Sequence, residues 1–230
     1  MRRLAFLVLA LLAGAAWGKE VAVDVGHYLA EPGAISARGV PEFQYNLHLA
    51  AAVKAALVRA GFVVRMIGER GDYSELGART RAARGADFFL SIHHDSAKAR
   101  LLKTWTYQGR AEHYGDRFSG FSLFISHENP YPQASLACAA AIGARLRAAG
   151  FHPSRYHADP VLGEGRPFAD EKNGVHWFDH LAVARSATMP AALLEAGVIV
   201  NRAEELRLRE PRVERRIARA VAQGLRSCLR

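Results

Sequence analysis

The stretch VAVDVGH at residues 21–27 alternates valine with smaller or polar residues and then turns at Gly26 and His27. Two further stretches have a similar form, FFLSIHH at residues 88–94 and AALLEAG at residues 191–197. In each stretch an apolar run ends at an ionisable residue. Such runs are typical of strands that are buried on both faces of a sheet. These three stretches therefore provide the framework of the predicted fold.

Helical periodicity alternates with strand patterns in the first half of the chain. The pattern predicts, in order, a strand over 21–25, a helix over 44–60, a strand over 62–67, a helix from 74 to 85 and a strand over 87–92. This order predicts a single α/β domain, with a twisted, mostly parallel sheet and helices on both faces. Ligands bind such sheets beyond the carboxyl ends of the strands, which is where His27 and His93 fall.

The second half of the chain is less regular. It predicts long loops over 98–119 and 151–174, strands over 120–126, 181–184 and 191–195, a helix over 133–149, a short helix with a capping box of Asn201 and Glu204, and a last helix from Pro211. The sequence shows no internal repeat and no linker rich in serine, glycine or proline, so we expect one domain.

The first eighteen residues, MRRLAFLVLALLAGAAWG, have the arginines, the apolar run and the small-residue cleavage site of a secretory signal. The apolar run is shorter than the ~20 residues of a membrane span. We therefore predict a cleaved signal over 1–18 and a domain over 19–230 without a membrane span. The protein would be exported to the periplasm or, alternatively, to the cell wall or extracellular space.

The formal net charge of +9 suits an anionic partner. Such a partner could be nucleic acid, anionic lipid or anionic cell-wall polymer, and export makes nucleic acid the least suitable of the three. The alternative is that the charge only forms a solvated, arginine-rich surface. Cys138 and Cys228 both fall in predicted helices. In an oxidising compartment they form either one disulfide or two buried thiols, and the sequence leaves this open.

Four of the ionisable residues have the chemistry of a zinc hydrolase. Neutral imidazole and carboxylate both bind zinc, and three protein ligands leave a fourth position for water or substrate. His27, Glu42 and His93 could supply such a set, with Glu195 as a further acid at the end of a buried run. A histidine at a strand end is nevertheless more often a surface or hydrogen-bonded residue than a ligand.

Longer motifs join these residues. VAVDVGH is followed by PGA (32–34), GVPE (39–42) and Asn46-Leu47, then by SIHHDS (91–96) and MPAALLEAGVIVN (189–201). In order and separation these motifs resemble those of the zinc-dependent N-acetylmuramoyl-L-alanine amidases of the amidase 3 family, over nearly the whole of residues 19–230.

The resemblance implies a twisted sheet of about six strands and one zinc ion, with His27, Glu42 and His93 as its ligands and Glu195 as the catalytic carboxylate. It implies that peptidoglycan is the partner and substrate, cut at the amide between N-acetylmuramic acid and the first L-alanine of the stem peptide. Members of the cell-division type are restrained by a helix over the cleft and released by an activator protein. Residues 98–119 and 151–174 are the segments in which such a restraining helix could lie. Neither has the period of an amphipathic helix, which favours a cleft that is open to substrate at all times.

The chain departs from the family pattern at several positions. Tyr28 and Leu29 stand where the family has glycines, which makes the loop after His27 bulkier. His94 replaces the common alanine, and either contacts substrate or is an ordinary polar neighbour. Asp95 is a candidate for substrate binding or for orienting His93 through a hydrogen bond.

Other patterns carry less weight. His176 and His180 have the spacing of ligands on one helix face, but the glutamate of H-E-x-x-H is absent and the segment is predicted as loop and strand. The aromatic residues from Trp105 to Phe124 either bind glycan or pack a long loop. Two alternatives to the amidase remain, a zinc peptidase that cuts another peptidoglycan bond and an inactive peptidoglycan-binding or regulatory module.

Overall fold

The computed structural model describes residues 18–229, so the predicted signal peptide lies outside the described residues except for Gly18. A seven-stranded sheet forms the centre, in the order β2-β1-β3-β9-β6-β8-β7. Its strands are β1 (Glu20–Val25), β2 (Val63–Ile67), β3 (Phe88–Asp95), β6 (Ser122–Ile125), β7 (Phe168–Asp170), β8 (Val175–Trp177) and β9 (Ala191–Val198). The neighbours from β2 to β9 are parallel, whereas β6 pairs antiparallel with β9 and β7 pairs antiparallel with β8. The predicted mostly parallel α/β sheet is confirmed, with seven strands where about six were expected.

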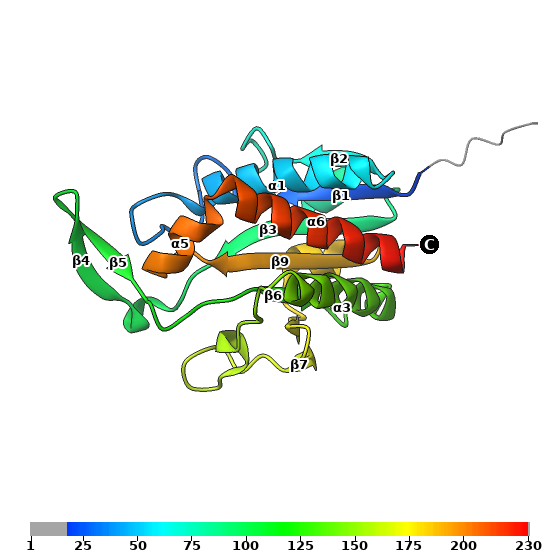
Figure 1. Cartoon of the computed structure of the whole chain (residues 1–230). Helices are drawn as coiled ribbons and strands as arrows, with labels where there is room; N and C mark the ends of the chain where they lie inside the picture. The colour runs from blue at the N-terminus through cyan, green and yellow to red at the C-terminus, as the bar shows by residue number, and fades with distance from the viewer. Residues whose placement is uncertain (1–17, 230) are drawn as a thin grey trace, which may run out of the picture.

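Helices cover both faces of the sheet. In Figure 1, three long helices lie side by side in front of it, α1 (Glu42–Arg59), α6 (Pro211–Cys228) and α3 (Pro132–Ala148). Two short helices, α2 (Leu76–Ala82) and α4 (Ala182–Ser186), pack on the opposite face, and α5 (Arg202–Leu208) follows β9. No helix within residues 18–229 is both long enough and apolar enough to span a membrane.

Alternating side chains of β9 build the two halves of the core. Leu194 belongs to the cluster under the long helices, whereas Leu193 belongs to the cluster on the face of α2 and α4. The last helix, predicted from Pro211, is observed as α6, and its apolar stripe of Val213, Ile217, Val221 and Leu225 is buried. Burial on both faces explains why the strands are nearly continuous apolar runs.

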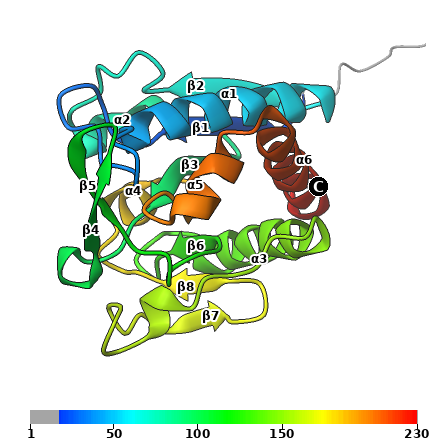
Figure 2. The same ribbon diagram turned by 60° about the vertical axis from the view of Figure 1, so that its left-hand side comes forward.

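The segment 98–119 is not the long loop that was expected. After a short 3-10 turn at Ala99–Leu101 it forms a two-stranded hairpin of β4 (Lys103–Tyr107) and β5 (Arg110–Tyr114). The hairpin projects from the body at the left of Figure 1 and comes forward at the left of Figure 2. Its two-residue turn uses Gln108 and Gly109, both with positive φ (50° and 76°). Such turns usually have the sequence Asn-Gly or Asp-Gly, so the Gln-Gly pair only weakly indicates a hairpin in the sequence.

The aromatic side chains of the hairpin pack rather than stand free. Trp105 is half-buried, and its indole N–H donates to the carbonyl of Ala37 at 2.8 Å. The guanidinium carbons of Arg38 and Arg202 lie 5.4 and 5.0 Å from the centre of its ring. These contacts favour the packing alternative for this residue.

Three smaller expectations also changed. The segment 181–184, predicted as a strand, lies at the start of α4, because a five-residue helix is too short to show its period. The loop 151–174 contains a 3-10 turn at Tyr156–Ala158 and strand β7. Asn201 caps α5 by accepting from the backbone N–H groups of Ala203 and Glu204, but Glu204 accepts from Gly120 and Val198 and does not complete the capping box.

Cys138 of α3 and Cys228 of α6 form a disulfide, at a sequence separation of 90. The bond joins the last turn of the chain's final helix to the body, which answers the question that the sequence left open.

Because this bond closes a long loop, we expect C138A/C228A to lower the free energy of unfolding by about 2–4 kcal/mol. Urea unfolding of the oxidised protein and the variant measures this difference. Reductant should lower the stability of the wild type and leave the variant unchanged. Equal stability of the wild type with and without reductant would contradict the expectation.

Candidate metal centre

The centre lies at the carboxyl edge of three parallel strands. Val25 of β1 pairs with Ile92 of β3, and His93 pairs with Glu195 of β9. Neighbouring strands lie about 4.8 Å apart, so β1, β3 and β9 deliver their polar ends to one place. His27 follows β1 directly, and Glu42 arrives as the first residue of α1.

A buried arginine fixes the end of β1. Arg79 of α2 is 2% exposed, and its guanidinium donates to Asp24 Oδ1 at 2.7 Å and to the carbonyl of Val25 at 2.6 Å. It also donates to the carbonyls of His27 and Tyr73. His27 itself has φ 67°, a conformation that costs energy for a residue with a side chain. The arginine therefore holds the backbone in the turn that presents the imidazole.

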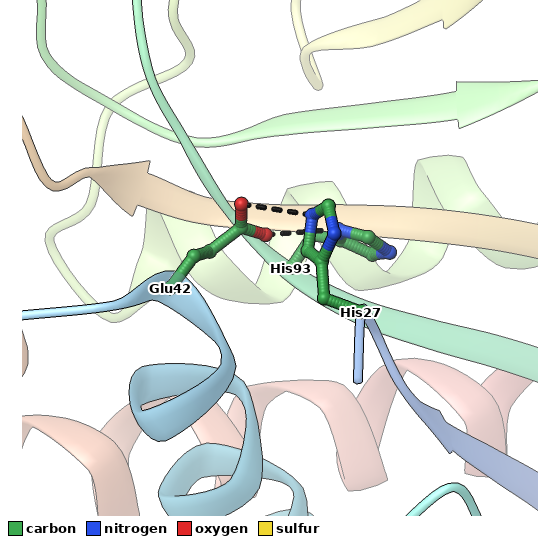
Figure 3. Close-up of side chains that lie close together, drawn as sticks. All are labelled: His27, Glu42 and His93. Carbon is green, nitrogen blue, oxygen red and sulfur yellow. Dashed lines mark hydrogen bonds and ion pairs between the residues drawn. The ribbon is translucent and has the colours of Figure 1, made fainter. Parts of the chain in front are cut away.

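Glu42 links the two imidazoles. Its Oε2 lies 2.9 Å from His27 Nε2, and its Oε1 lies 2.9 Å from His93 Nδ1, so the carboxylate points at both rings (Figure 3). The backbone N–H groups of Ala34 and His94 also donate to this carboxylate, at 3.1 and 3.2 Å. Burial alone would raise the pKa of Glu42, but the hydrogen bonds and charges of the two histidines hold it well below its usual range.

A second layer of hydrogen bonds orients Glu42. The amide nitrogen of Asn46, one turn along α1, donates to Glu42 Oε1 at 3.0 Å and to the carbonyl of Gly26 at 3.2 Å. His94 Nδ1 lies 2.8 Å from the amide oxygen of Asn46, and burial lowers the pKa of His94 to about 3. The neutral imidazole therefore donates to Asn46. His94 is 3% exposed and packs beside Tyr45, so the structure places it behind Glu42 and away from solvent.

Two glycines of the motifs leave room for the ligand side chains. A Cβ on Gly26 would lie 2.2 Å from Nε2 of His93. A Cβ on Gly33 would lie 2.4 Å from Glu42 Oε2 and 2.5 Å from His27 Cδ2, and Gly33 also has φ 79°. Only glycine fits at these positions without displacing the cluster.

Glu195 is the unpaired acid of the site. It lies beside His93 in the register of β3 and β9, and its Oε2 is buried without a hydrogen-bond partner among the described residues. Burial, followed by the negative charges of Asp95 and Glu42, holds the pKa of Glu195 well above its usual range. A buried oxygen without a donor favours a water or a cation beside it.

Asp95 contacts a residue that the sequence did not single out. Its Oδ2 lies 2.7 Å from His157 Nε2, and Glu164 Oε2 lies 2.7 Å from His157 Nδ1. No hydrogen bond joins Asp95 to His93 in the described structure. His157 and Glu164 come from the loop 151–174, so this pair of contacts fixes the loop beside the site. No local pattern announces a contact between residues 62 positions apart.

A cavity of about 380 Å³ opens next to His27 and His93. Tyr28 and Tyr73 form part of its wall, together with Leu76 and Leu181 of the α2 and α4 regions. His27 is the most open of the three, with 32% of its side chain exposed, against 16% for His93. The cluster is therefore reachable from this cavity.

The other histidine pair does not form a site. His176 lies in β8, fully buried between Phe124 and Phe168, and burial lowers its pKa to about 4. His180 lies in the turn before α4, so the two do not share a helix face.

The residues at the sheet edge fit a divalent metal. One ligand atom from each of His27, Glu42 and His93 lies within 4.8 Å of the others. Two imidazoles and a carboxylate with an open side are the donor set of catalytic zinc. The nearby orphaned oxygen of Glu195 adds a carboxyl group that this donor set does not need as a ligand. Fold and site together thus define a class, the α/β proteins with a candidate metal site at the carboxyl edge of a parallel sheet.

The family follows from comparison with known proteins. The model of the amidase 3 family, described as N-acetylmuramoyl-L-alanine amidase, matches residues 21–227, and the chain belongs to this family. All the motifs that suggested the resemblance, from VAVDVGH at 21–27 to MPAALLEAGVIVN at 189–201, lie within the match.

Curated relatives and solved structures agree. The chain is 27% identical over 227 residues to the probable N-acetylmuramoyl-L-alanine amidase AmiB of Haemophilus influenzae, covering 89% of this chain and 51% of that protein. It is 28% identical over 210 residues to the sporulation-specific N-acetylmuramoyl-L-alanine amidase of Bacillus subtilis, covering 90% of this chain and 66% of that protein. The chain thus spans between half and two thirds of the length of these relatives.

Among solved structures, Ami1 of Mycobacterium smegmatis superposes with a TM-score of 0.72 at 20% identity, covering 92% of this chain and 97% of that one. The CwlD amidase of Clostridioides difficile, solved in complex with the GerS lipoprotein, superposes with a TM-score of 0.66 at 18% identity, covering 92% and 98%. These similarities confirm the fold.

The charge of His157 makes a pH-dependent contribution to stability. Burial alone would lower its pKa, but the hydrogen bonds and charges of Asp95 and Glu164 raise it from 6.5 to about 9. The contribution is therefore complete below pH 6.5 and is lost as the pH rises through 9. Below pH 6.5 we expect the free energy of unfolding of H157Q to be about 3 kcal/mol lower than that of the wild type. This difference in stability should shrink as the pH rises through 9. Urea unfolding across this range tests the sign, and a gap independent of pH would contradict it.

Proposed function

We propose that this chain is a zinc-dependent N-acetylmuramoyl-L-alanine amidase, which hydrolyses the amide between N-acetylmuramic acid and L-alanine in peptidoglycan. The observation that carries the proposal is the position of Glu195, whose Oε2 is buried and unpaired beside His93 of the cluster that His27, Glu42 and His93 form. Membership of the amidase 3 family supports the choice of bond.

Zinc bound by His27, Glu42 and His93 would supply a Lewis acid that polarises the scissile carbonyl and lowers the pKa of a water. The chain's own residues do the rest. Arg79 and Asn46 keep the ligand side chains in place, and a cation in their midst would favour the ionised form of Glu195. Glu195 then accepts a proton from the attacking water and can deliver it to the leaving nitrogen of L-alanine.

Access to the cleft bears on the need for a partner. The two segments considered for a restraining device, 98–119 and 151–174, form a hairpin and an irregular loop with one short strand, and neither contains an α-helix. His27 remains one-third exposed beside them. We therefore propose activity without an activator, although a family neighbour, CwlD, was solved with a lipoprotein bound.

Export to the periplasm, with removal of residues 1–18, is part of this proposal. The disulfide between Cys138 and Cys228 supports it, since such bonds persist in oxidising compartments. Wall or extracellular location is the alternative, and both place the chain with peptidoglycan and away from nucleic acid.

The first test is metal removal. We expect the purified protein to contain one zinc ion per chain and to release stem peptides that begin with L-alanine from purified peptidoglycan. Chelation should abolish this release, and added zinc should restore it. Mass analysis identifies the bond: products cut inside the peptide would instead indicate a zinc peptidase, and zinc binding without any product would indicate a binding module.

The second test separates the base from the ligands. E195Q keeps the shape of the side chain but cannot accept the proton, so hydrolysis should fall by about two to four orders of magnitude while zinc content stays at the wild-type level. H27A, E42A and H93A should lose zinc as well as activity. Metal analysis and peptide release on the same preparations make the comparison. Turnover near the wild-type rate in E195Q would contradict the assignment of Glu195 as the general base.

A further inference from the structure

The outward face of α6 is strongly basic. The helix carries five arginines, at positions 212, 215, 216, 219 and 226, and all five are exposed. Its single acid, Glu214, faces His48 of α1 at 3.9 Å. The chain has a formal net charge of +9, and α6 is where much of its positive charge gathers.

Four of the arginines of this region line one groove. A hollow of about 260 Å³ lies between the last turn of α1 and the outer side of α6, and its charged lining is Arg59, Arg215, Arg219 and Arg226. Ala56, Ala60 and Ala222 provide an apolar floor. Arg212 pairs with Glu210 at the start of α6, but none of the four groove arginines pairs with a carboxylate within residues 18–229.

Helix stability explains only part of this arrangement. Arg59 and Arg226 lie in the last turns of their helices, where the carbonyl ends attract cations. Arg215 and Arg219 lie in the middle of α6, one turn apart, and a pair of like charges at this spacing destabilises a helix. A partner with negative charge would offset that repulsion.

The groove lies far from the metal centre. Glu42 begins α1 and Arg59 ends it, so at 1.5 Å per residue the groove is roughly 25 Å from the ligands. In Figure 1 the strands β3 and β9 point towards the left, whereas α6 ends at the right, beside the C label. The chain enters the domain at this same end, because the carbonyl of Lys19 accepts from the N–H of Val63, just after α1.

We propose that this groove docks the domain on an anionic phospholipid surface. Arginine forks match phosphate oxygens, and the four groove arginines present them together, without a paired carboxylate among the described residues. A bilayer on this end leaves the carboxyl edge of the sheet pointing away from the lipid. A wall polymer held here would instead lie roughly 25 Å from the site that should cut it, so the geometry favours lipid as the occupant.

The test uses residues 19–230, the form left by the proposed cleavage, which contains every described helix and strand, so that the N-terminal apolar run cannot bind lipid itself. Vesicles of phosphatidylcholine, with or without phosphatidylglycerol, are sedimented with the protein. We expect binding only to the anionic vesicles, and weaker binding as salt is added. R215Q/R219Q should weaken it roughly thirtyfold, since each basic residue near an anionic surface contributes about fivefold.

Two matched variants control the experiment. R215K/R219K keeps the charges and should retain most of the binding, whereas K103Q/R110Q removes the same charge from exposed positions on the hairpin and should have no effect. Absence of binding to anionic vesicles at low salt, or an equal loss in K103Q/R110Q, would overturn the proposal. Binding to purified peptidoglycan through Arg215 and Arg219 in place of lipid would overturn it too. The assay needs neither zinc nor turnover, so its outcome is independent of the proposed amidase activity.

Discussion

The shared register of β1, β3 and β9 is the constraint on which the centre depends. Parallel pairing brings the ends of these strands to one edge, with Val25 level with Ile92 and His93 level with Glu195. A shift of one residue in either pairing would turn a ligand to the opposite face of the sheet. The apolar runs oppose such a shift, because it would exchange the side chains of two separately packed core layers. Packing of the core thus sets the geometry of the polar edge.

That edge gathers more buried charge than a small core usually tolerates, and nearly all of it is paired. Arg79 meets Asp24 and three backbone carbonyls, while Glu42 accepts from two imidazoles, an amide and two backbone N–H groups. Unpaired buried charges cost several kcal/mol, so each partner both stabilises the fold and fixes an orientation. Glu195 is the exception, because its Oε2 lies beside His93 without a hydrogen-bond partner among the described residues. An uncompensated acid in such a place supports the proposed hydrolytic role.

Long, regular elements could be predicted from the sequence, and short or non-local features could not. The strands around Val23 and Leu90 and the stripe of α6 have clear periods, because each buries a continuous face. The hairpin turn at Gln108 and Gly109 lacks the usual residues, and α4 is too short to show a period. For the site, the spacing of residues alone could not predict that Glu42 contacts His27 and His93. Only the resemblance to the family placed these three residues in one site. His157 stayed hidden because its partners are set by how a loop folds back on the sheet.

Helix α1 ties the chemistry of the two ends together. It begins with a ligand side chain at the carboxyl edge of the sheet and ends with an arginine in the basic groove, and its length alone sets their separation. Because α1 packs along α6 and the sheet, the two ends cannot move independently. A surface that binds the basic groove therefore also fixes the direction in which the cleft at the metal centre faces. For the proposed amidase, that direction would decide which part of the cell envelope the cleft can reach, and the rigid body of the domain would set it.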